Sequence, residues 1–182
     1  MCNRLDGPMS ERNWFKADSI AERSRDILVS FDSKWRDLLM GHSIECIVRR
    51  RYPKSFSPRR MYFYVGSPHS ELIGFADVND LRTITFNEGL QILGKTGLTR
   101  RELDSYFSGY EGLGCYALSR TTIFKQSLSL ETLRTRSGFS PPQSFVALSQ
   151  RASDWLAQQE PVELPGERRK RQTARKTMVR QR

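Results

Sequence analysis

The sequence predicts an α+β fold that is mostly β: a small barrel of five or six antiparallel or mixed strands, with helices inserted between some of them. Short runs rich in β-branched and aromatic residues recur between turn-forming residues, as strands do. Helical periodicity lies between some of these runs but does not alternate with them regularly, and no glycine-rich strand-to-helix turn is present. A doubly wound sheet is therefore disfavoured. A chain of 182 residues is expected to form one domain.

Five runs are predicted as strands, and one further segment as extended chain. They are 27–31, 44–51, 60–67, 71–85, 114–125 and, for the extended segment, 140–148. Pro53 and Pro58 end the second run, because proline lacks the N–H that a sheet ladder needs. Gly74 inside the fourth run predicts a bulge or the close approach of another backbone.

Helices are predicted between and around these strands. They cover 10–26, 32–41, a segment from 86 to about 94, a segment after Thr99, 128–134 and 149–159. Thr99 is followed three residues later by Glu102, the spacing of a capping box. We divide the chain into an N-terminal helical extension (1–26), a β-barrel domain (27–160) and a basic tail (161–182).

Positive charge is concentrated at the C-terminus. The net charge is +10, of which residues 167–182 carry +7. This stretch has no apolar period and follows a proline-containing segment, so we expect a disordered arm that attracts phosphates without reading sequence. A merely solubilising tail is the alternative. The expected phosphate contacts are Arg168, Arg169, Lys170, Arg171, Arg175 and Lys176.

Several classes of protein are disfavoured by composition. No apolar run approaches the roughly 18 residues of a membrane span, and the N-terminus has no secretory signal, so we expect a cytoplasmic protein with no membrane partner. Cys2, Cys46 and Cys115 are odd in number and widely spaced, which suggests neither a disulfide framework nor a thiolate metal site. With only two histidines as well, no metal and no cofactor are expected.

The order of short blocks resembles the ASCH family of PUA-like β-barrel domains. These blocks are ILVSF, a Trp-containing helix ending at Gly41, IVRRR, YVGSP, ELIGFADV, TGLTRRELDSYFSG, GCYALS and SPPQSFVAL. The resemblance covers residues 27–148 and leaves out the N-terminal segment and the basic tail. It implies a curved barrel with a cleft between the sheet and the inserted helices, a surface that PUA-like domains use for RNA or for a flipped or modified base.

The positions that match the family's basic strand end are Arg49, Arg50 and Arg51. Side chains alternate along a strand, so Arg49 and Arg51 are expected on one face and Arg50 on the other. Guanidinium groups bind phosphate in a bidentate manner and stack on bases. The adjoining turn is expected to extend this basic strip and to add stacking surfaces, through Tyr52, Lys54, Phe56, Arg59 and Arg60. The alternative is a solvated strand edge that discourages pairing with other molecules.

Four small polar residues complete the predicted site. Gln143 and Ser144 can present an amide and a hydroxyl to a base edge, although the segment that carries them can equally plug the barrel with Phe145. Ser30 and Ser67 match recurrent small polar positions of the family and are expected to line the cleft; both can equally be turn residues.

Hydrolase chemistry is left open. One branch of the ASCH family resembles amidohydrolases, and it carries a lysine two residues and a threonine five residues after the glycine that matches Gly41. This chain has Ser43 and Cys46 at those two positions. A one-residue shift that aligns the arginines places Ile44 and Ile47 there instead. A Cys46 nucleophile needs a neighbouring base, for which only His42 lies nearby. Ribonuclease chemistry needs no fixed motif, and the eligible acids and bases are Lys34, Lys54, Lys95, Tyr52 and Tyr106. Asp77 and Asp80 can hold magnesium, or be turn and cap residues.

The leading hypothesis is therefore an RNA-binding module that holds RNA or one unstacked or modified nucleotide in a basic cleft, with the tail adding nonspecific affinity. A nucleic-acid-processing hydrolase on the same fold is the alternative. A DNA-binding transcription regulator ranks last, because no helix-turn-helix signature is present. The predicted N-terminal helix is available for a protein partner.

Overall fold

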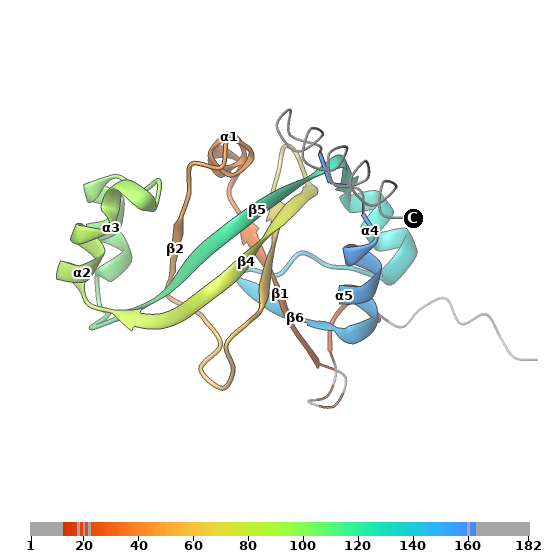
Figure 1. Cartoon of the computed structure of the whole chain (residues 1–182), viewed down its shortest axis with the longest axis horizontal. Helices are drawn as coiled ribbons and strands as arrows, with labels where there is room; N and C mark the ends of the chain where they lie inside the picture. Colours follow the sequence, from red (N-terminus) through yellow and green to blue (C-terminus); the bar gives the residue numbers. More distant parts are fainter. Residues whose placement is uncertain (1–12, 18, 20, 22, 160, 163–182) are drawn as a thin grey trace, which may run out of the picture.

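The computed structural model describes residues 13–17, 19, 21, 23–159 and 161–162 (Figure 1). The elements in chain order, where η marks a 3₁₀ helix, are β1 (Arg23–Phe31), η1 (Ser33–Trp35), α1 (Arg36–Met40), β2 (Cys46–Arg49), β3 (Arg60–Val65), β4 (Glu71–Ile84), α2 (Phe86–Gln91), η2 (Leu93–Lys95), α3 (Arg100–Phe107), β5 (Leu113–Ser129), α4 (Leu130–Ser137), β6 (Phe145–Ser149) and α5 (Gln150–Ala157).

The six strands form one mixed sheet in the order β2-β5-β4-β3-β1-β6. The β1–β3 pair is parallel, and every other pair is antiparallel. The predicted α+β fold class, mostly strand with helices inserted between some of the strands, is confirmed. In one respect the sheet differs from a closed barrel: within the described residues no ladder joins the two edge strands β2 and β6, so the sheet is open.

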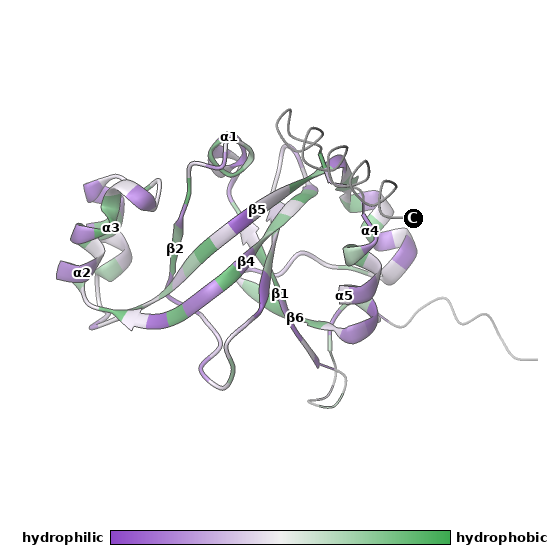
Figure 2. Cartoon of the chain, in the orientation of Figure 1, coloured by the Kyte–Doolittle hydropathy of each residue, from purple (hydrophilic) through white to green (hydrophobic). Residues whose placement is uncertain are grey.

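Both faces of the central strands are buried, because side chains alternate along them. In β1, Ile27 and Val29 join one hydrophobic core while Leu28 joins a second core on the opposite face. Helices α2 and α3 lie at one end of the sheet and α4 and α5 at the other (Figure 1). Helices α2, α3 and α5 show both hydrophilic and hydrophobic segments, as expected of helices with one face on a core (Figure 2).

Bulges curve the sheet between its two longest strands. The register of β4 against β5 shifts at three places, one of them between Leu72 and Gly74. Such bulges increase local twist and bend the strand that carries them. Gly74 approaches the β5 backbone closely, as predicted, because a Cβ at this position would overlap the Thr122 carbonyl oxygen and lie 2.9 Å from the Cα of Ile123.

The predicted helix over 10–26 is wrong for the part of it that the structure describes. Trp14 and Phe15 form a turn, Lys16 bridges to Leu148 of β6, and β1 already begins at Arg23. Phe15 and Ala17 are buried whereas Lys16 is exposed, which is the period of extended chain. Backbone hydrogen bonds to β6 satisfy this segment in place of helical ones, such as Ala17 N to Ala147 O at 3.2 Å. The protein partner expected for this helix loses its structural basis.

The inserted helices are short and well capped. Thr99 and Glu102 form the predicted capping box of α3, and Thr85 with Glu88 forms a second one at α2. In each box the threonine side chain accepts from the glutamate N–H while the glutamate carboxylate accepts from the threonine N–H. None of the helices in the described part of the chain has the length and hydropathy to cross a membrane.

Replacing Gly74 with alanine is expected to destabilise the fold. The added methyl group overlaps the β5 backbone, so the free energy of unfolding should fall by about 1–3 kcal/mol in chemical denaturation. Gly94→Ala is the matched control, because a Cβ at this position has no neighbour within 4 Å. Equal stability of the two variants would contradict the close approach of β4 and β5.

Candidate nucleic-acid interface

One face of the β2–β5–β4 segment gathers the side chains of the candidate site. Arg49, Gly114 and Thr83 occupy paired positions across the three strands. The next row on the same face, two residues along each strand, contains Ile47, Tyr116 and Leu81. Because residues two apart in a strand share a face, both rows point to the same side of the sheet.

Tyr52 covers the middle of the first row. A Cβ on Gly114 would lie 2.8 Å from Tyr52 Cβ and closer still to the tyrosine ring, so only glycine leaves space for this ring above β5. The Tyr52 hydroxyl and Thr83 Oγ1 are 2.6 Å apart, a hydrogen bond that ties the segment after β2 to β4. The ring is thereby placed beside Arg49, which pairs with Gly114.

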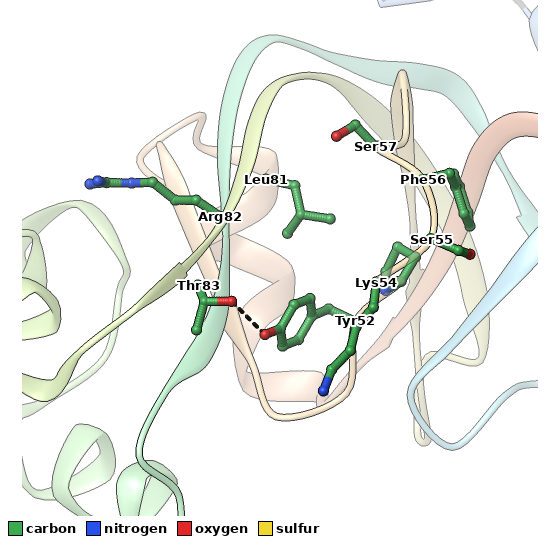
Figure 3. A pocket seen from close by; sticks show the side chains of 9 residues that line it. Tyr52, Lys54, Ser55, Phe56, Ser57, Leu81, Arg82 and Thr83 are labelled. Carbon is green, nitrogen blue, oxygen red and sulfur yellow. Dashed lines mark hydrogen bonds between the residues drawn. The ribbon is translucent and has the colours of Figure 1, made fainter.

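A cavity of about 540 Å³ lies between the β2–β3 connection and β4 (Figure 3). Its lining residues are Tyr52, Pro53, Lys54, Ser55, Phe56, Ser57, Leu81, Arg82 and Thr83. They supply aromatic rings, hydroxyl groups and two cations, and include no carboxylate. Leu81 points into the space enclosed by the connection, whereas the Arg82 side chain points away from it (Figure 3) and pairs with Glu88 at 3.5 Å.

Arg49 is half-buried and has no carboxylate partner in the described part of the chain. Its Nη2 donates to the Ser30 carbonyl oxygen at 3.1 Å, and its guanidinium lies 4.5 Å from the centroid of the Phe31 ring. Its Nε is buried and has no hydrogen-bond partner among the described residues. Burial disfavours the charged form and lowers the pKa of Arg49.

Tyr116, on the same face, has a buried hydroxyl that also lacks a partner in the described residues. Burial raises the pKa of Tyr116, so this hydroxyl keeps its proton at neutral pH and can donate it in a hydrogen bond. Unpaired buried donors are costly and rare in native structures. Arg49 Nε and the Tyr116 hydroxyl are therefore two buried donors whose hydrogen bonds the described residues do not supply.

The other arginines of the predicted strip are held by the fold itself. Arg50 donates to the carbonyl oxygens of Ser105 and Tyr106, the latter at 2.8 Å, and its guanidinium lies 5.0 Å from the centroid of the Tyr110 ring. These carbonyls belong to the last turn of α3, where a cation also complements the helix dipole. Arg50 thus anchors α3 to the end of β2.

Arg59 and Arg60 pair with carboxylates instead of facing solvent alone. Arg59 contacts both carboxylate oxygens of the fully buried Asp26, at 3.2 and 3.1 Å. Arg60 Nε lies 3.4 Å from Asp77 Oδ1, and its guanidinium lies 4.9 Å from the centroid of the Phe75 ring. Asp77 also pairs with Arg120 at 2.7 Å, so both carboxylates serve internal ion pairs.

Arg51 and Lys54 are exposed cations of the strip that the fold does not hold. Both follow β2 directly, and Lys54 lines the cavity. The structure gives neither side chain a hydrogen bond or an ion pair within the described residues. Of the predicted basic residues, Arg49, Arg51 and Lys54 therefore stay candidates for an anionic ligand.

Of the four predicted small polar residues, the structure brings two together and places the other two elsewhere. Ser30 and Ser144 are brought together, since Ser30 N donates to the Ser144 carbonyl oxygen at 3.1 Å, and the buried Ser30 Oγ has no partner among the described residues. Ser67 is exposed in the turn between β3 and β4, and Gln143 is exposed before β6. The tail residues Arg168, Arg169, Lys170, Arg171, Arg175 and Lys176 lie outside the described residues.

Sequence reasoning missed Leu81, Thr83, Gly114 and Tyr116. Side-chain alternation in the fourth and fifth predicted strands indicates which of their residues share a face. The pairing register between the strands is also needed to place that face beside Arg49. Within the described residues no group of three or more His, Cys, Asp or Glu side chains is placed to hold a metal ion.

No family model matches the sequence, and no curated protein matches it either. Among solved structures, the chain is similar to ASCH from Zymomonas mobilis, with a TM-score of 0.68 at 22% identity, over 77% of this chain and 100% of that one. The chain has an ASCH-domain fold. Two mutants of the same Zymomonas ASCH protein, one serine-to-alanine and one tyrosine-to-phenylalanine, align with TM-scores of 0.67 and 0.66 at 21% identity. They cover 75% and 74% of this chain and 96% and 97% of theirs, so the ASCH fold accounts for most of the described domain.

Replacing Arg49 with methionine is expected to leave the free energy of unfolding within about 1 kcal/mol of the unmodified chain. Removing a buried charge that lacks a carboxylate offsets the loss of its contacts with Ser30 and Phe31. Arg50→Met is the matched control and should lose about 1 kcal/mol or more, because the last-turn carbonyls of α3 lose their donors. Chemical denaturation measures both, and a larger loss for Arg49→Met would assign Arg49 a structural role.

Proposed function

We propose that this chain binds RNA through its ASCH-fold domain, with one unstacked nucleotide in the cavity between the β2–β3 connection and β4. The observation that carries the proposal is the pair of buried donors without partners, Arg49 Nε and the Tyr116 hydroxyl, on the sheet face that bears Tyr52. A phosphate or a base edge supplies the acceptors that these groups lack.

The lining of the cavity suits a nucleotide better than a neutral apolar ligand. Tyr52 and Phe56 offer rings for stacking, and the hydroxyls of Ser55, Ser57 and Thr83 can exchange hydrogen bonds with base or sugar. Lys54 adds charge beside the cavity, and none of the lining residues is acidic. A volume of about 540 Å³ lies within the range of small-molecule sites and can hold one nucleotide.

Binding to a short labelled single-stranded RNA, followed by fluorescence anisotropy at moderate salt, tests the site. Tyr52→Leu fills the space over Gly114 but removes the aromatic face, so the dissociation constant should rise about fivefold or more. Tyr52→Phe keeps the ring and loses only the hydrogen bond to Thr83, so it should bind nearly as tightly as the unmodified chain.

Arg49→Met should weaken binding about tenfold or more, as loss of a charge-assisted bidentate contact does. Arg134→Met is the charge-matched control, because Arg134 is exposed on α4 at the other end of the sheet (Figure 1). Equal affinity of the Arg49 and Arg134 variants would refute the assignment of the cavity. Cleavage of the RNA during the experiment, lost in a cavity variant, would instead indicate the hydrolase alternative.

Deleting residues 167–182 should reduce the salt dependence of RNA binding. For single strands the logarithm of affinity falls by about 0.7 per neutralised phosphate for each tenfold rise in salt, and the deleted segment carries eight Lys and Arg residues. The ratio of affinities between the unmodified and Tyr52→Leu domains should persist in the shortened chain. An unchanged salt slope would exclude the tail from the interface.

A further inference from the structure

Two cysteines occupy neighbouring positions on the face of β2 and β5 that is opposite to Arg49. Cys46 pairs with Ala117, and Val48 pairs with Cys115. Paired residues share a face, as do residues two apart in a strand, so both thiols lie on one side of this strand pair. Cys46 and Cys115 are thus diagonal neighbours across adjacent strands. Both are free thiols.

The two thiols differ in exposure and in charge. Cys46 is half-buried on an edge strand, while Cys115 is buried in the core. A hydrogen bond from the Cys115 thiol is the main cause that lowers the pKa of Cys46 to about 7, against the opposing effect of burial; Lys95 and Arg82 contribute by charge. The same hydrogen bond and burial raise the pKa of Cys115. Cys46 is therefore both the more accessible of the two thiols and the more readily ionised.

We propose that Cys46 and Cys115 are a redox modification site, in which a peroxide converts them into a reversible disulfide that links β2 to β5. The Cys46 thiolate attacks one peroxide oxygen, the O–O bond breaks, and hydroxide leaves with Cys46 oxidised to sulfenic acid. The Cys115 sulfur, losing its proton, then attacks the Cys46 sulfur, and the S–O bond breaks with release of water. Two thiols lose two electrons in total, and one hydrogen peroxide becomes two water molecules.

The place of β2 in the sheet allows this bond to form. Diagonal Cβ atoms across an antiparallel pair are separated by somewhat less than about 7–8 Å, whereas a disulfide needs about 3.5–4.5 Å. One strand must therefore shift. Strand β2 has four residues and a ladder on one side only, so it can shift at lower cost than β5, which pairs on both sides. Oxidation is then expected to move the end of β2, where Arg49 lies.

Peptide mapping after treatment with one equivalent of hydrogen peroxide tests the proposal in full-length chain with Cys2→Ser. The intact mass should fall by two hydrogen atoms, and a non-reducing tryptic digest should join the peptide 37–49, which contains Cys46, to the peptide 102–120, which contains Cys115. Dithiothreitol should restore both peptides. The mapping uses chain with both cysteines in place, so it does not depend on whether a cysteine variant folds.

Single variants separate the roles of the two thiols. In Cys115→Ser, the sulfenic acid of Cys46 has no resolving thiol and should be trapped by dimedone, whereas Cys46→Ser should acquire no dimedone adduct. The proposal is overturned if Cys46 gains two oxygen atoms without forming the bond to Cys115, or if disulfides form only between chains. RNA binding is not part of this test, so its outcome is independent of the proposed function.

Discussion

A single half-buried arginine connects two strands that are not neighbours in the curved sheet. Strands β2 and β1 are separated by three other strands in the order of the sheet, yet Arg49 of β2 donates to a β1 carbonyl and lies over the Phe31 ring. This approach requires the strong curvature that the bulges of β4 and β5 introduce. The cation thus bridges the edge strand β2 and the strand β1, which lies next to the opposite edge strand β6. Its side chain links curvature, core packing and the candidate site.

A half-buried cation without a carboxylate partner, such as Arg49, contributes little to the stability of a fold. Its Nε has no partner in the described residues, and a carbonyl with an aromatic ring compensates only part of the lost hydration. Arg59 is a contrast, since it donates two hydrogen bonds to the Asp26 carboxylate, which also accepts a hydrogen bond from Ser153. The fold therefore supplies acceptors for the Arg59 guanidinium but none, among the described residues, for Arg49 Nε. A buried donor without a partner is rare in native structures, and the ligand proposed above would supply the missing acceptor.

Local sequence signals predicted much of the fold, because they report interactions within a few residues. The Thr99–Glu102 box and the close approach at Gly74 depend on spacing and on the absence of a side chain, and both are present in the structure. The prediction of an N-terminal helix was wrong because Phe15 and Ala17 follow the alternating period that pairing with β6 uses. The spacing of Trp14 and Ala21, seven residues apart, fits a helix as well. Local pattern alone does not distinguish these two outcomes.

The candidate site was predicted less completely, because the role of each arginine depends on contacts distant in sequence. Arg49, Arg50 and Arg51 are consecutive and chemically identical, yet their surroundings differ. Arg49 is half-buried against β1, Arg50 holds the end of α3, and Arg51 is exposed without a partner in the described residues. Alternation along a strand separates Arg50 from Arg49 but does not reveal which face meets a helix and which meets the cavity.

Base preference in the proposed RNA complex is expected to depend on the connection between β2 and β3. An ASCH fold at 21–22% identity determines the path of the sheet, not the chemistry of the connection that follows β2. In this chain that connection supplies most of the cavity lining, from Tyr52 to Ser57, and it is held in place by Tyr52 through Gly114 and Thr83. Arg49 belongs to strand β2, whereas the rings and hydroxyls belong to the connection. In the proposed RNA complex, the sheet recognises the phosphate and the connection recognises the attached base. Changes in 52–57 are then expected to alter the preferred base and to keep the charge that would bind the phosphate.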